Sequence, residues 1–133
     1  MLLVDSSVWI DVSRGVDTDA TRFLEARDEE ELAVTGVVFQ EVLQGADDPT
    51  YEKLRAMFSA MLLLEPRELS TYEIAAQLYR RARAAGFTIR KASDCLIAAL
   101  ALEHGALLVH NDRDFVFLSQ VEPALMIFPG RPH

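Results

Sequence analysis

The 133-residue chain has the length of one domain, and its composition, half hydrophobic and a quarter charged, excludes a disordered chain. Its single cysteine excludes an internal disulfide and cysteine-based zinc clusters, and its longest apolar run, residues 95–102, is far shorter than the ~20 residues of a membrane-spanning helix. The apolar start of the chain is interrupted by an acid at Asp5, and no basic residues precede it as they would in a signal peptide. We therefore expect one cytoplasmic domain over residues 1–133, with the last few residues as a tail and no membrane association.

The net charge of −8 argues against a protein that coats DNA, because an acidic surface repels the phosphate backbone. The charges are unevenly distributed along the chain. Residues 28–31 are all acidic, which is typical of a solvated helix end, whereas residues 80–91 contain five of the 13 bases and no acid. The basic stretch either compensates the dipole at the end of a helix or contacts phosphates, and the sequence leaves both interpretations open.

Short apolar runs alternate with amphipathic segments, a pattern that predicts alternating strands and helices. Residues 2–4 predict a buried strand that ends in a cap or turn at Asp5, Ser6 and Ser7. Later strands are predicted at residues 32–35, 62–64, 106–109 and 125–128. Helices are predicted at residues 19–31, 36–45, 49–61, 70–85, 92–104 and 114–121.

Two of these helices have informative ends or faces. Asp48 is the expected N-cap of the helix that begins at Pro49, and the helix at residues 92–104 is apolar on almost every side, as in a helix buried at the centre of a domain. Short apolar strands that alternate with helices predict an α/β fold, in which a short-stranded parallel sheet is flanked by helices. In such sheets, ligands bind beyond the carboxyl ends of the strands.

Acidic side chains stand at those expected strand ends. Asp5 directly follows the first strand, and Asp112 and Asp114 follow the fourth. Glu41 lies in the helix after the second strand, and Asp94 lies in the first turn of the most apolar helix. Each acid alone has an ordinary explanation as a cap, a turn residue or an exposed side chain. Together they predict a site at one edge of the sheet.

Clustered carboxylates need a cation or bound protons, because two anions 4 Å apart repel by about 4 kcal/mol at an effective dielectric of 20. An all-carboxylate set favours Mg²⁺, with Mn²⁺ as a substitute, over zinc or copper. A calcium-binding EF-hand is excluded, since the residues after Asp112 and Asp114 lack its third acid, its glycine and its terminal glutamate. Mg²⁺ held by carboxylates is typical of phosphoryl chemistry.

The segments at residues 1–7, 89–99 and 110–115, together with Glu41 after a strand, resemble PIN-domain ribonucleases, specifically VapC-type toxins of bacterial toxin–antitoxin modules. The resemblance extends over residues 1–128. It implies a single PIN-like domain, Mg²⁺-dependent endoribonuclease activity on an RNA substrate, a homodimer, and a VapB-type antitoxin that blocks the site.

By position, the family's acidic quartet corresponds to Asp5, Glu41, Asp94 and Asp112, and Asp114 matches an additional acid found in many members. We expect all five to be catalytic. In our hypothesis Asp5 and Asp94 hold the principal Mg²⁺, and Asp112 and Glu41 complete its shell through water or bind a second ion.

Four further residues are candidates for substrate binding. Ser6 either steadies a carboxylate or phosphate oxygen or is a plain helix cap. Arg90, Lys91 and Arg113 are expected to attract the RNA backbone to a site that would otherwise repel it.

Other residues of reactive types are expected to be structural. Cys95 and Trp9 are predicted in the core, His104 at the end of a helix, and His110 in a hydrogen bond to the backbone.

Two other functional classes remain open at this point. A phosphotransfer domain of the receiver or phosphatase type also places acids around Mg²⁺, but a receiver requires a lysine after a late strand, and the phosphatase type requires Asp-x-Asp where this chain has Asp5-Ser6-Ser7. A non-catalytic PIN-like binding module is the other alternative. Degradation of total RNA that EDTA abolishes would discriminate between these classes.

Overall fold

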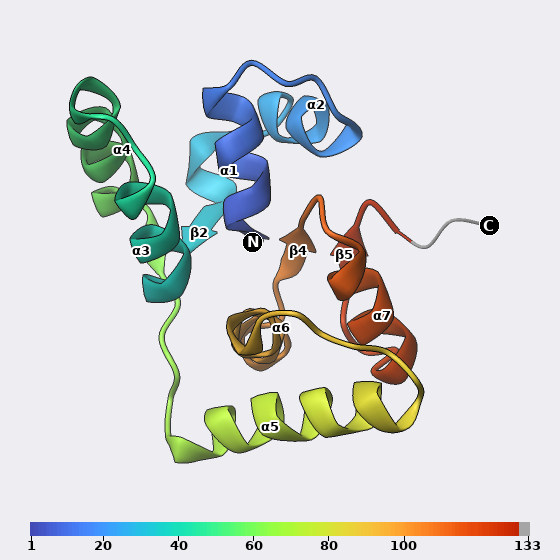
Figure 1. The fold of residues 1–133 in the computed structure, drawn as a ribbon. Helices are drawn as coiled ribbons and strands as arrows, with labels where there is room; N and C mark the ends of the chain where they lie inside the picture. Colours follow the sequence, from blue (N-terminus) through green and yellow to red (C-terminus); the bar gives the residue numbers. More distant parts are fainter. Residues whose placement is uncertain (131–133) are drawn as a thin grey trace.

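The computed structural model describes residues 1–130, and the tail expected at the end of the chain falls on residues 131–133, outside that part. Five parallel strands form one sheet in the order β3-β2-β1-β4-β5 (Figure 1). The strands are β1 (Leu2–Val4), β2 (Leu32–Val34), β3 (Leu62–Leu63), β4 (Leu107–Val109) and β5 (Ile127–Phe128). The predicted α/β fold with a short-stranded parallel sheet is confirmed.

Helices cover both faces of the sheet, with α1 to α4 on one side and α5 to α7 on the other (Figure 1). They are α1 (Ser6–Ser13), α2 (Asp19–Glu25), α3 (Gly36–Gln44), α4 (Asp48–Ser59), α5 (Leu69–Ala84), α6 (Ala92–His104) and α7 (Arg113–Val121). Across residues 1–130, no helix has both the length and the apolar character required to cross a membrane.

The order of the strands reverses next to the central strand β1. From β1 the chain moves outward to β2 and β3, and then returns beneath the opposite face to β4, on the other side of β1. Ligands of parallel sheets bind where the strand order reverses in this way, beyond the carboxyl ends of the two strands. Here those ends are joined by the Asp5 N–H, which donates to the Val109 carbonyl at 2.9 Å.

Helix α6 is the centre of the second helical layer, between the sheet and α5 (Figure 1). Seven of its residues are buried, as its uniformly apolar sequence predicted. The helix ends at Gly105, whose φ of 64° lies in the left-handed region that glycine adopts without strain.

A helix that the sequence did not predict follows β1. The side chain of Asp5 accepts a hydrogen bond from the Ser7 N–H and caps α1, and Val8 and Trp9 are buried within this helix. The expected turn at residues 5–7 is therefore the cap and first turn of a helix, and the expected capping role of Asp5 is confirmed.

The predicted helix at residues 19–31 is too long. It ends at Glu25, and Glu29–Glu31 form only a short 3₁₀ turn before β2. The four consecutive acids at residues 28–31 account for the early end, because they repel one another and would lie at the negative end of the helix dipole. Two smaller differences are that Asp47, rather than Asp48, caps α4, and that β5 is shorter than the predicted strand.

Candidate active site

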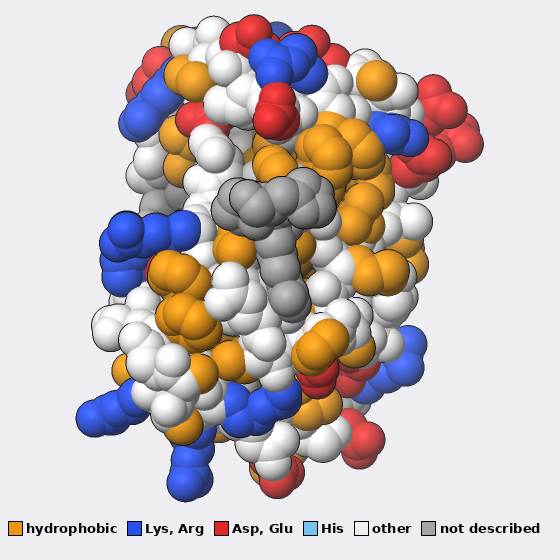
Figure 2. All heavy atoms as spheres, turned by 90° about the vertical axis from the view of Figure 1, so that its right-hand side faces the viewer, with side chains coloured by type: hydrophobic (Ala, Val, Ile, Leu, Met, Phe, Trp, Pro, Cys, Tyr) orange, Lys and Arg blue, Asp and Glu red, His pale blue; other side chains and the backbone are white. Residues whose placement is uncertain are grey.

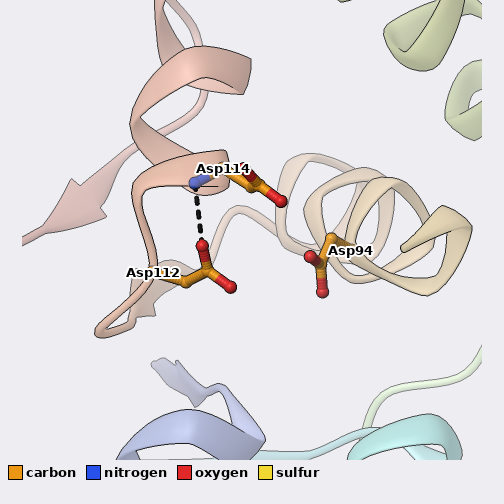
Figure 3. A group of neighbouring side chains, drawn as sticks. All are labelled: Asp94, Asp112 and Asp114. Carbon is orange, nitrogen blue, oxygen red and sulfur yellow. Dashed lines mark hydrogen bonds between the residues drawn. The ribbon is translucent and has the colours of Figure 1, made fainter. Parts of the chain in front are cut away.

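Acidic residues from separate parts of the chain meet beyond the carboxyl ends of β1 and β4. Asp5 follows β1, Asp94 lies in the first turn of α6, and Asp112 is the N-cap of α7, with Asp114 in the first turn of that helix. One carboxylate oxygen from each of Asp94, Asp112 and Asp114 lies within 4.8 Å of the others. Figure 3 shows these three side chains directed toward a common space from α6 and the start of α7.

Asp5 is fixed by its own helix. Its Oδ2 accepts hydrogen bonds from the Ser7 N–H at 3.1 Å and the Ser7 hydroxyl at 2.6 Å. Its Oδ1 is buried and has no hydrogen-bond partner among residues 1–130. One oxygen of Asp5 therefore holds the start of α1, and the other is left for a ligand.

Glu41, in α3, lies beside Asp5 and is the fifth member of the acid cluster, whose other members are Asp5, Asp94, Asp112 and Asp114. Its Oε2 lies 3.6 Å from the Lys91 ammonium, and the Ser6 hydroxyl interacts with the same carboxylate. Burial and the charge of Asp5 raise the pKa of Glu41. Ser6 is thus placed beside a carboxylate of the cluster, and its expected role in substrate binding stays a prediction.

The most perturbed acid is Asp94, which is almost fully buried. Burial, followed by repulsion from Asp5 and Asp112, raises its pKa to about 7. Within residues 1–130, three carboxylate oxygens are buried without a hydrogen-bond partner, and they are Asp5 Oδ1, Glu41 Oε1 and Asp94 Oδ2. Unpaired buried anions are costly, so three of them in one cluster indicate a place for a hard cation.

The sequence did not single out the polar bridge between the ends of β1 and β4. The Ser7 hydroxyl, which donates to Asp5, also accepts a hydrogen bond from the Asn111 N–H at 3.1 Å. The Asn111 side chain in turn donates to the Asp11 carboxylate at 2.7 Å. The signals in the sequence were a serine two residues after a capping aspartate and an asparagine just beyond a strand, and neither shows that the two residues meet.

The basic stretch at residues 80–91 separates into two groups. Arg81 and Arg83 lie in the last turn of α5, where they complement the helix dipole, and Arg81 also pairs with Glu122. This end of α5 lies at the lower right of Figure 1, and basic side chains gather at the lower end of the face shown in Figure 2. Arg90 and Lys91 instead pair with acids of the cluster, so the dipole interpretation holds for Arg81 and Arg83, and phosphate contact by Arg90 and Lys91 stays a prediction.

Arg90 and Lys91 bracket the cluster from the segment before α6. Arg90 forms ion pairs with Asp112 and Asp114, whereas Lys91 pairs with Glu41. Arg113, the third predicted base, is exposed at the start of α7 and has no ion pair within residues 1–130.

In a comparison with known families, the PIN domain matches residues 2–119 of this chain. The chain belongs to the PIN domain family. The resemblance that its acidic motifs predicted is therefore confirmed over nearly the whole length of the chain.

A curated relative supports the same assignment of this PIN domain, and solved structures share its fold. VapC ribonuclease Mb1587 of Mycobacterium bovis is 36% identical over 125 residues, which cover 91% of this chain and 93% of the relative. FitAcB from Neisseria gonorrhoeae has a similar fold, with a TM-score of 0.71, 20% identity and 96% of each chain covered. A toxin–antitoxin complex from Klebsiella pneumoniae gives a TM-score of 0.68 at 21% identity, covering 86% of this chain and 90% of the other.

The other residues of reactive types in this PIN domain have structural roles, as the sequence predicted. Cys95 is buried in α6, and burial raises the pKa of its thiol to about 11, which disfavours the nucleophilic thiolate. Trp9 is buried against Phe58. His104, at the end of α6, bonds the Glu65 carbonyl.

His110 is held in one tautomer at the end of β4. Its Nδ1 accepts from the Asp112 N–H at 3.1 Å, so its Nε2 carries the proton and donates to the Pro129 carbonyl at 3.0 Å. Burial lowers the pKa of His110 and favours this neutral form. His110 therefore fixes the backbone that presents Asp112.

Proposed function

We propose that the protein is a Mg²⁺-dependent endoribonuclease and the toxin of a type II toxin–antitoxin pair, acting in the cytoplasm as a homodimer. The observation that carries the proposal is a set of three buried carboxylate oxygens, from Asp5, Glu41 and Asp94, that have no hydrogen-bond partner within residues 1–130 and gather around Asp5. The 36% identity to a VapC ribonuclease over most of the chain supports RNA as the substrate. Membership of the PIN domain family disfavours the receiver and phosphatase alternatives.

The donor set fits Mg²⁺, with Mn²⁺ as a substitute, because it consists of carboxylates only. Asp5 and Asp94, whose free oxygens are buried, would hold the principal ion, and Asp112 and Glu41 would complete its shell. When bound, Mg²⁺ offsets the charge on the phosphate and lowers the pKa of a coordinated water.

The chain's own side chains organise the reaction around this ion. Ser7 holds Asp5 through two hydrogen bonds, which keeps its Oδ1 turned away from the helix cap. Arg90 pairs with Asp112 and Lys91 with Glu41, and their charges would reduce the repulsion between the RNA backbone and the acids. Exposed Arg113 adds a further phosphate contact at the start of α7.

A direct test incubates the purified protein with total RNA in the presence of Mg²⁺, Mn²⁺ or EDTA. We expect endonucleolytic fragments with either metal and none in EDTA. A small phosphodonor added in parallel tests for phosphotransfer. Intact RNA under all conditions, with protein that is folded and binds Mg²⁺, would contradict the proposed function.

Mg²⁺ binding is expected to weaken as the pH falls through about 7, because a proton on Asp94 competes with the ion. One such group reduces the affinity ~10-fold between about pH 8 and about pH 6. Without metal, the stability of the fold depends on pH in the opposite direction. The pKa of Asp94 is higher in the folded than in the unfolded protein, so the free energy of unfolding falls as the pH rises toward about 7. Thermal melting with and without Mg²⁺ across this range checks both slopes, and a Mg²⁺ effect independent of pH would contradict the assignment.

The antitoxin is expected to insert an arginine or lysine into the acid cluster, since a guanidinium pairs with carboxylates through two hydrogen bonds. Adding the product of the neighbouring gene at equal concentration should abolish RNA cleavage, and replacing its inserted arginine with alanine should restore it. If the isolated protein is expressed freely without any partner and still degrades RNA at full rate, the toxin assignment is wrong.

A further inference from the structure

A series of hydrogen bonds connects the surface of α1 to the carboxylate of Asp5. The Asn111 side chain donates to Asp11 Oδ2 at 2.7 Å, and the Asn111 N–H donates to the Ser7 hydroxyl at 3.1 Å. The Ser7 hydroxyl in turn donates to Asp5 Oδ2 at 2.6 Å. Asn111 lies between β4 and α7, so these bonds tie that segment to a helix about 100 residues earlier in the sequence.

Asn111 is held to α1 at two points. Ser7 and Asp11 are four residues apart in α1, about one helical turn, and residues at that spacing lie on the same face of a helix. The backbone N–H of Asn111 bonds the first of them, and its side-chain amide bonds the second. The bond to Asp11 has a carboxylate as acceptor, which makes it one of the stronger kinds of hydrogen bond. It therefore holds the Asn111 backbone beside Ser7.

The bond from Asn111 determines what the Ser7 hydroxyl can do. A serine hydroxyl has one hydrogen to donate and two lone pairs that accept, and it rotates to suit its partners. Because the Asn111 N–H can only donate, the Ser7 oxygen accepts there and keeps its single hydrogen for Asp5 Oδ2. Asp5 Oδ2 also accepts from the Ser7 N–H, whereas Asp5 Oδ1 is buried without a hydrogen-bond partner within residues 1–130. One oxygen of Asp5 is thus fixed, which leaves the other turned toward the metal site.

Asp112, the residue after Asn111, is held independently. Its N–H donates to His110 Nδ1 at 3.1 Å, and its Oδ1 accepts from the Asp114 N–H at 3.0 Å. Removing the Asn111 side chain takes away neither bond. The effect of Asn111 is therefore expected at Asp5 and not at Asp112.

We infer that Asn111 and Asp11 are positioning residues of the metal site: Asp11 anchors Asn111, and Asn111 acts through Ser7 to keep Asp5 Oδ1 directed at the ion. This inference rests on the proposed function, in which Asp5 is a ligand of Mg²⁺. Groups that orient a metal ligand without touching the metal matter for affinity, and their loss typically weakens binding about 10- to 100-fold.

The first test is the Mg²⁺ dissociation constant of the folded protein, measured by calorimetry. Asn111→Ala, which changes no charge, should raise the constant about 10-fold, and Asp11→Ala should raise it at least as much. In a Ser7→Ala background, Asn111→Ala should add less than about twofold, because it acts through Ser7. The matched control is Glu52→Ala, which removes an exposed acid of α4 and its bonds to Arg55 and should leave the constant unchanged. A constant for Asn111→Ala within about twofold of the parent value overturns the inference.

An exchanged pair separates the hydrogen bond from the charges. Asn111→Asp alone brings a second carboxylate against Asp11 and breaks the bond, so we expect weaker Mg²⁺ binding, although the added charge by itself would strengthen it. Asp11→Asn combined with Asn111→Asp restores a bond between the two positions, with donor and acceptor exchanged and the parent's net charge. This double variant should bind Mg²⁺ within about threefold of the parent. Tighter binding by Asn111→Asp, or a folded double variant that binds as weakly as Asn111→Ala, contradicts the positioning role.

RNA cleavage at increasing Mg²⁺ distinguishes a positioning role from the loss of a catalytic group. For Asn111→Ala, the Mg²⁺ concentration of half-maximal rate should rise by the same factor as the dissociation constant. The rate at saturating Mg²⁺ should return to within about twofold of the parent. A bond that only supports the fold would instead lower the melting temperature in EDTA and leave the Mg²⁺ dependence unchanged.

Failure of the inference can be distinguished from failure of the proposed function. A parent protein that binds Mg²⁺ but cleaves no RNA contradicts the proposed function, and the dissociation constants of the variants still decide the role of Asn111. A parent that cleaves RNA, paired with an Asn111→Ala variant of unchanged Mg²⁺ affinity, overturns the inference alone. A folded parent that binds no Mg²⁺ overturns both.

Discussion

Replacing Asp94 with asparagine is expected to reduce RNA cleavage by at least ~100-fold while the protein stays folded. Asparagine preserves the size of the side chain, and because Lys91 is the N-cap of α6, the helix loses only the interaction of one charge with its dipole, about 0.3–1 kcal/mol. What it removes is the negative charge of a buried carboxylate whose Oδ2 has no partner among the described residues. The loss therefore falls on metal binding and not on the start of α6.

Thermal melting separates these two roles of Asp94. In EDTA the variant should be at least as stable as the parent, because one source of repulsion with Asp5 and Asp112 is gone. The additional stabilisation that Mg²⁺ gives the parent should disappear. Asp48→Asn, at an exposed first-turn acid of α4, is the matched control and should change neither property. Full cleavage by Asp94→Asn would refute the metal site.

The sheet and most helices were predictable because their signals are local. Buried strands of parallel sheets are continuous apolar runs, and residues 2–4, 32–34 and 107–109 have this form. Helix α1 was not predictable in the same way. It has only eight residues, and its stability depends on the Asp5 cap and on burial of Val8 and Trp9, which the complete fold provides.

The acid cluster was predictable for a different reason. In a parallel sheet the carboxyl ends of the strands share one edge, so acids that follow β1 and β4 are brought together by topology alone. The partners of those acids were not predictable. Whether Arg90 bonds Asp114, or Ser7 meets Asn111, depends on how segments far apart in the sequence pack against one another.

Replacing Phe58 with alanine is expected to lower the free energy of unfolding by about 3–5 kcal/mol, out of a total of ~5–15 kcal/mol for a domain of this kind. Phe58 joins α4 to α1 and α3: its ring lies 5.3 Å from that of Trp9 and 6.0 Å from that of Phe39, between centroids. Urea unfolding measures the loss, with exposed Tyr51→Ala on the same helix as a control within about 0.5 kcal/mol of the parent. A loss below about 1 kcal/mol would contradict this packing, and with it the support that α4 gives to α3, the helix that carries Glu41.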